Sequence, residues 1–200
     1  MERRPAVDPT VFVSTFALIF LAEIGDKSQL MTIALASRHR ALPVILGTFS
    51  AFALLNLLAV FFGGALSQLV PRPLLLACAA ALFLFFACQF WREEPEDSDG
   101  AVRQGAKFSA LVASFSLIFL AELGDKTQLA IVALASRGED TGTVFAAGTA
   151  AEWMLALIGI LLGRAFLRAV PLRQVHRGAA LLFALFGVLA LAEASRALTL

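Results

Sequence analysis

Long apolar stretches separated by short polar breaks dominate the pattern of this chain. No charged residue occurs in residues 41–71 or 74–91, and an α-helix needs roughly 20 apolar residues to cross the hydrocarbon core of a bilayer. Because an open sheet leaves backbone groups unsatisfied in lipid, each stretch is predicted to be a helix. The six predicted spans cover residues 11–36, 41–66, 74–91, 108–135, 143–162 and 175–192.

The first and fourth spans share a sequence repeat. Residues 16–30, FALIFLAEIGDKSQL, return as residues 115–129, FSLIFLAELGDKTQL. The match continues through residues 34–38 and 133–137, and the offset stays between 99 and 101 residues as far as the Val-Pro pairs at 70–71 and 170–171. We therefore predict that a unit of three helices is duplicated along the whole chain.

An odd number of spans in each half means that the two halves enter the membrane in opposite senses. This is an inverted repeat with a pseudo-two-fold axis in the membrane plane, which is typical of secondary transporters. We divide the single membrane domain, residues 1–200, into repeat 1 (11–91), an acidic linker (92–107) and repeat 2 (108–197). The linker side holds nine basic residues against five on the other side. The positive-inside rule thus predicts a cytoplasmic linker and termini outside.

Composition agrees with an all-α integral membrane protein. The chain is 60% hydrophobic and only 16% charged, whereas a soluble domain is roughly a quarter charged. The net charge of +1 does not indicate a nucleic-acid partner. Cys78 and Cys88 fit no metal or redox spacing, no removable targeting sequence is indicated, and a P-loop for nucleotide-driven transport is absent from the sequence.

The repeated block places charged residues near the middle of a span. Glu23, Asp26 and Lys27 are spaced i, i+3 and i+4, which puts all three on one face of a continuous helix. The second copy has the same spacing in Glu122, Asp125 and Lys126. An ionised side chain at the bilayer centre costs about 2.5–3.5 kcal/mol even on the most lenient scale. These groups are therefore expected to meet one another, water or an ion inside the bundle.

Two interpretations of the block remain. In a structural one, each lysine pairs with its neighbouring carboxylate and locks the halves together. In the other, four carboxylates and two ammonium groups leave a charge of −2, which a divalent cation balances. The candidate metal ligands are Glu23, Asp26, Glu122 and Asp125, and the candidate supporting polar residues are Lys27, Ser28, Gln29, Lys126, Thr127 and Gln128. Oxygen donors favour hard cations such as Ca²⁺, Mn²⁺ or Mg²⁺.

Three further residues bear on mechanism. Gly25 and Gly124 favour local unwinding that frees backbone carbonyls as ligands, with small-residue packing as the alternative. Glu152 lies deep in a span, opposite Ala51 of the first half. It is a candidate for a proton path or an interface residue near a helix end.

The chemistry of the block favours exchange over the competing classes. A buried carboxylate without its cation tends to take up a proton, so a site that binds M²⁺ when ionised and H⁺ when empty has the chemistry of an antiporter. An intramembrane aspartyl protease needs two acids that share a proton, and here a lysine stands beside each aspartate. A cation channel or small-solute transporter is the remaining alternative.

The blocks EIGDKS (23–28) and ELGDKT (122–127) closely resemble the signature of the GDT family of Mn²⁺/Ca²⁺:H⁺ exchangers, or second calcium:cation antiporter family. Both copies match its doubled E-x-G-D-[KR]-[TS] motif, and the resemblance covers nearly the whole chain. It implies six or seven spans, no enzyme activity, no cofactor, and export of Mn²⁺ or Ca²⁺ against protons through the motif acids. It also favours Mn²⁺ and a bacterial inner membrane. Oligomeric state, a homodimer included, stays open.

Overall fold

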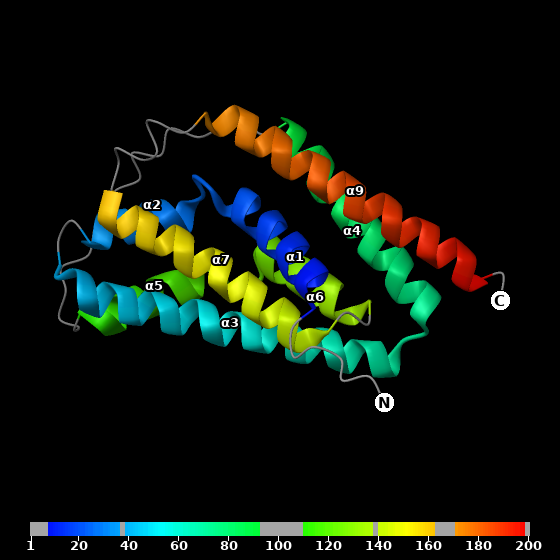
Figure 1. The fold of residues 1–200 in the computed structure, drawn as a ribbon. Coiled ribbons are helices and arrows are strands. Elements are labelled where there is room, and N and C mark those ends of the chain that lie inside the picture. Colours follow the sequence, from blue (N-terminus) through cyan, green and yellow to red (C-terminus); the bar gives the residue numbers. More distant parts are fainter. Residues whose placement is uncertain (1–7, 37–38, 93–109, 138–139, 163–170, 199–200) are drawn as a thin grey trace.

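The computed structural model describes residues 8–36, 39–92, 110–137, 140–162 and 171–198, and all regular structure in these ranges is α-helical (Figure 1). The linker predicted at 92–107 lies outside them, apart from Arg92. The helices are α1 (Pro9–Glu23), α2 (Lys27–Ala36), α3 (Ala41–Leu69), α4 (Arg72–Arg92), α5 (Ala110–Glu122), α6 (Lys126–Ser136), α7 (Thr141–Leu162) and α9 (Leu172–Leu198).

The described helices include four that are long and apolar enough to cross a membrane: α3, α4, α7 and α9. α1 and α2 make a fifth span if they are counted together across a bend of 71°. α5 is a shorter apolar helix, followed by α6. The spans predicted as single helices at 11–36 and 108–135 are therefore each broken into two, which corrects that part of the prediction.

The two halves are intertwined rather than stacked as separate units. α3 packs against α5 and α6 of the second half, and α7 packs against α1 and α2 of the first half. α3 and α7 run in opposite directions along the bundle, as do α4 and α9, which form a closely packed pair (Figure 1). The short broken helices of each half thus lie against the long helix of the other half.

Glycines on α3 allow it to approach the second half closely. A Cβ atom on Gly47 would clash with the Leu111 carbonyl oxygen of α5, and one on Gly63 would lie 2.7 Å from the Val132 carbonyl oxygen of α6. Helix association in lipid depends on such close backbone packing, because lipid tails are as apolar as the side chains.

Apolar side chains fill the interior and also cover the outside of the bundle. Phe83 and Phe183, both fully buried, join α4 to α9 with ring centroids 6.0 Å apart. On the outer faces, Leu161, Leu120 and Phe61 are 73%, 70% and 69% exposed. An exposed apolar surface of this kind is suited to lipid chains, so the described helices are those of a multi-pass membrane protein.

Candidate functional site

Both copies of the repeated block interrupt their helices, because α1 gives way to α2, and α5 to α6, inside the block. Gly25 and Gly124 have φ angles of 81° and 78°, in the left-handed region that glycine tolerates best. Glu23, Asp26 and Lys27 therefore do not share one helical face, as their spacing predicted for a continuous helix. The acids instead lie around a turn in the bundle interior.

A glutamine side chain stabilises each helix break by accepting a backbone hydrogen bond. In a continuous helix the Gly25 N–H would donate to the carbonyl of Leu21. It donates to Gln29 Oε1 instead, at 2.8 Å, and the Gly124 N–H donates to Gln128 Oε1 at 3.0 Å. Local unwinding, predicted from the two glycines, is confirmed. Because the Gly25 N–H donates to Gln29, the Leu21 carbonyl does not receive the hydrogen bond that a continuous helix would give it.

The aspartates begin the second helix of each pair. Asp26 Oδ1 accepts from the Lys27 N–H at 2.6 Å, and Asp125 Oδ1 accepts from the Lys126 N–H at 2.8 Å. An aspartate that caps a helix and is followed three residues later by glutamine resembles a capping box. This D-x-x-Q spacing is a sequence signal for a helix start, and the prediction of one continuous helix overlooked it.

We expect Gly124→Ala to lower the free energy of unfolding by about 1–2 kcal/mol, the cost of a left-handed conformation for an L-residue. Apart from its two chain neighbours, no described residue has an atom within 4 Å of the added Cβ, so the effect isolates backbone strain. Gly64→Ala is the matched control. Gly64 is inside α3 and its Cβ would meet Thr141 Cγ2 at 3.9 Å, so alanine should leave stability unchanged or raise it by up to about 1 kcal/mol. Denaturation of both variants in mixed micelles measures the difference, and equal values would contradict strain at the break.

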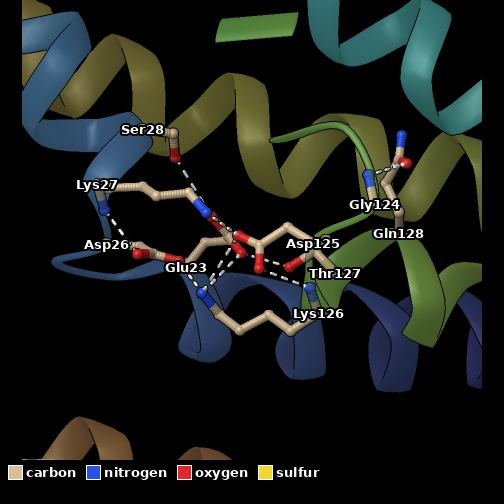
Figure 2. A network of polar contacts seen from close by, with 9 residues as sticks. All are labelled: Glu23, Asp26, Lys27, Ser28, Gly124, Asp125, Lys126, Thr127 and Gln128. Carbon is tan, nitrogen blue, oxygen red and sulfur yellow. Dashed lines mark hydrogen bonds and ion pairs between the residues drawn. The ribbon is translucent and has the colours of Figure 1, made fainter. Parts of the chain in front are cut away.

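The lysines of the motifs pair with acids of the opposite half. Lys27 Nζ lies 2.8 Å from Asp125 Oδ2, and Lys126 Nζ makes a short ion pair with Asp26 Oδ2 (Figure 2). Lys126 Nζ also lies 3.7 Å from Glu23 Oε1. The structural interpretation paired each lysine with its own neighbouring carboxylate, but the shortest lysine–carboxylate contacts in the structure join one half to the other. We call these contacts the crossed ion pairs.

The two motif glutamates are nearly completely buried, with exposed fractions of 3% for Glu23 and 2% for Glu122. Glu23 accepts hydrogen bonds from the hydroxyl of Ser28, at 3.3 Å, and from that of Thr127 across the half boundary. Glu122 Oε1 has no hydrogen-bond partner within the part of the chain that the structure describes. The repeat would predict equivalent surroundings for Glu23 and Glu122, and the structure does not have them.

Oxygen atoms that could bind a metal are concentrated at the helix breaks, but the described side chains do not form a complete metal site. Within the described ranges no three His, Cys, Asp or Glu side chains are grouped closely enough to hold a metal ion. The two aspartates face lysine ammonium groups instead. The site formed by all four motif acids therefore stays a prediction.

Glu152 on α7 lies beside the cluster and is 4% exposed. Asn56 Nδ2 of α3 donates to Glu152 Oε2 at 2.6 Å and approaches Thr149 Oγ1 at 3.1 Å. Glu152 and Glu23 both line a small pocket. The sequence singled out Glu152 but gave no sign of its partner, because Asn56 comes from the other half.

The sequence of the chain matches one known family over both halves. A family model described as divalent cation/proton antiporter GDT1 matches residues 11–98 and 110–198. A GDT1-like protein of Synechocystis, sll0615, is 31% identical over 90% of this chain and 95% of its own length. A Vibrio cholerae protein whose name proposes manganese export is 33% identical over 90% and 89%. The chloroplast PAM71-homolog of Arabidopsis is 30% identical, with 81% and 53% covered. No solved structure matches significantly.

The family match covers both halves of the chain and is to an antiporter, which argues against the protease alternative. The matched family consists of transporters and not of enzymes, as the sequence predicted. The chain belongs to the GDT1 family of divalent cation/proton antiporters.

Proposed function

We propose that this protein exports Mn²⁺, or Ca²⁺, in exchange for protons, and that the acids of the two motifs bind the transported cation. The main support is the central cluster, where two helix breaks bring Asp26 and Asp125 into the crossed ion pairs with Lys126 and Lys27. Mn²⁺ is favoured because manganese export is the activity proposed in the name of the similar Vibrio cholerae protein.

In this proposal the lysines act as resident counter-ions. Lys27 and Lys126 neutralise the aspartates while no metal is bound, and an arriving divalent cation replaces them. A hard cation such as Ca²⁺ takes about six to eight oxygen ligands. The Glu23 carboxylate, the Thr127 hydroxyl and carbonyls released at the helix breaks are of this type.

Flux in proteoliposomes tests the exchange directly. Purified protein is reconstituted with a pH-sensitive dye inside the vesicles, and Mn²⁺ or Ca²⁺ is added outside. An exchanger should release protons from the lumen in proportion to the metal taken up. Metal flux that is independent of a pH gradient would identify a channel, and the absence of metal-driven proton movement would contradict the proposed function.

Metal affinity should fall steeply as pH decreases, because each carboxylate must be ionised to coordinate. Binding then displaces the protons that the empty site holds. Exchange of about two protons for one divalent ion would be close to charge-balanced. Calorimetric titration with Mn²⁺ in buffers of different ionisation enthalpy counts the protons released. A value near zero between about pH 6 and 8 would contradict exchange at this site.

We also propose that repeats 11–91 and 108–197 form an inverted repeat in a bacterial inner membrane, with the linker 92–107 in the cytoplasm. The opposite directions of α3 and α7 support this arrangement (Figure 1). Single cysteines at Ser98 and near the C-terminus, in a chain where Ser replaces the exposed Cys78 and Cys88, should react with an impermeant reagent from opposite sides. Labelling from one side would contradict the topology.

A further inference from the structure

One polar pair in the core has no counterpart in the repeat. Asn56 and Glu152 hydrogen-bond across the halves at 2.6 Å. The offset of 101 residues that relates Thr48 to Thr149 places Ala51 opposite Glu152 and Leu157 opposite Asn56. Both members of the pair therefore replace apolar residues, and together they make one side of the bundle chemically different from the other.

Glu152 and Glu23 line the same pocket between α1, α2, α3 and α7. The pocket has room for little more than one water molecule or one dehydrated ion. Asn56 occupies Oε2 of Glu152, and no hydrogen bond within the described ranges engages its Oε1. A carboxylate that is 96% buried thus has one oxygen available at an ion-sized space.

The other polar groups of the pocket are arranged as acceptors. Thr32 donates its hydroxyl proton to the Ser28 carbonyl at 2.8 Å, and Ser28 donates its own to Glu23 Oε2 at 3.3 Å. Their oxygen lone pairs remain available to a cation. Gln29 closes the wall, because its amide is engaged with Gly25 and with the Leu155 carbonyl.

Charge also distinguishes this pocket from the crossed ion pairs. The partner of Glu152 is a neutral amide, and the ammonium group nearest to Glu23 is that of Lys126, at 3.7 Å. No described lysine lines the pocket, and its two carboxylates and two hydroxyls are the kind of oxygen ligand that a hard divalent cation prefers.

We propose that Glu152 is a cation ligand outside the repeated motifs, and that the Glu23–Glu152 pocket holds the divalent cation against α7. Asn56 is a positioning residue that directs Glu152 towards the pocket. This inference rests on the proposed function, because it identifies where the exchanged cation binds. It makes the two motifs unequal, since Glu23 faces a second carboxylate through this pocket and Ala51 stands opposite Glu152 in the repeat.

Mn²⁺ binding to the purified full chain, followed by the electron paramagnetic resonance signal of free Mn²⁺, tests the assignment. Glu152→Gln should weaken binding by at least about 100-fold, the upper end of the losses seen when even outer-shell groups of metal sites are removed. Glu23→Gln should do the same, and the loss in the double variant should be smaller than the product of the two single losses, since both changes act on one site. Glu193→Gln, a membrane glutamate that pairs with Arg137 at 3.1 Å, is the matched control and should change affinity by less than about twofold.

Ligand replacement gives a second readout, which a structural role would not produce. Glu152→Cys, with Cys78 and Cys88 changed to Ser, should bind Cd²⁺ with a thiolate charge-transfer band in the ultraviolet, because thiolates prefer soft metals. The band should disappear when Glu23 is also changed to Gln. Absence of the band in a folded variant, or unchanged Mn²⁺ binding by Glu152→Gln, would overturn the proposal and leave the proposed function standing. A wild-type chain that binds Mn²⁺ through Glu152 but moves no protons would instead contradict the proposed function.

Discussion

Replacement of Asp26 and Asp125 together by asparagine is expected to abolish divalent-cation exchange while the protein still inserts into the membrane. Asparagine is as effective an N-cap as aspartate, so α2 and α6 keep the hydrogen bonds that their first N–H groups donate. The two negative charges of the crossed ion pairs are lost. We expect the rate of metal-driven proton release to fall by at least about 100-fold, or ~2.7 kcal/mol in activation free energy.

Asp140→Asn is the matched control for this double variant. Asp140 also caps a helix, because it accepts the Thr143 N–H at 2.9 Å at the start of α7, but it is not part of the crossed ion pairs. It should retain the wild-type rate within about twofold. Full exchange by the Asp26→Asn, Asp125→Asn variant in proteoliposomes would show that the motif aspartates are not the cation site.

Lys126→Met is expected to destabilise the protein much more than Lys27→Met. The Lys126 side chain is 14% exposed and contacts Asp26, Glu23 and Asp125. The Lys27 side chain is 46% exposed and, among the described residues, pairs with Asp125 alone. Removal of one partner from a buried ion pair costs about 3–5 kcal/mol, and a half-exposed pair contributes about 0–1 kcal/mol.

Unfolding of the two lysine variants in mixed micelles, at a pH where the carboxylates are ionised, measures this difference. Methionine is chosen because it keeps most of the length of the lysine side chain and adds no new hydrogen-bonding group. Equal losses in the two variants would mean that the two motifs are equivalent in stability, as the sequence repeat alone would predict.

Much of the architecture follows from patterns that are local in sequence. Apolar run length predicted an all-α membrane protein, and the doubled motif predicted the family; both are confirmed. The glycines in each motif predicted unwinding, and the φ angles of Gly25 and Gly124 confirm it. These features were accessible because each depends on neighbouring residues: on hydropathy, on backbone freedom or on a short motif.

The site itself depends on contacts between residues far apart in the chain. Nothing in the spacing of Lys27 indicates that its partner is Asp125 rather than Asp26. The same holds for Asn56 and Glu152, which belong to different halves. Repetition also favours equal roles for equal positions, whereas packing buries Lys126 and leaves Lys27 half exposed. Differences of this kind between the two motifs depend on how the long helices α3 and α7 pack against the short helices of the other half.

The crossed ion pairs also bear on how a duplicated gene of this kind could arise. Each half carries an aspartate whose nearest ammonium group belongs to the other half, so one half alone would leave its buried charges without those partners. In the inverted repeat proposed above, two separate copies would satisfy each other only by assembling antiparallel, with one inserted into the bilayer in the opposite sense to the other. Fusion into one chain fixes that stoichiometry and orientation at synthesis, and it frees the two copies to diverge at positions such as Ala51 and Glu152.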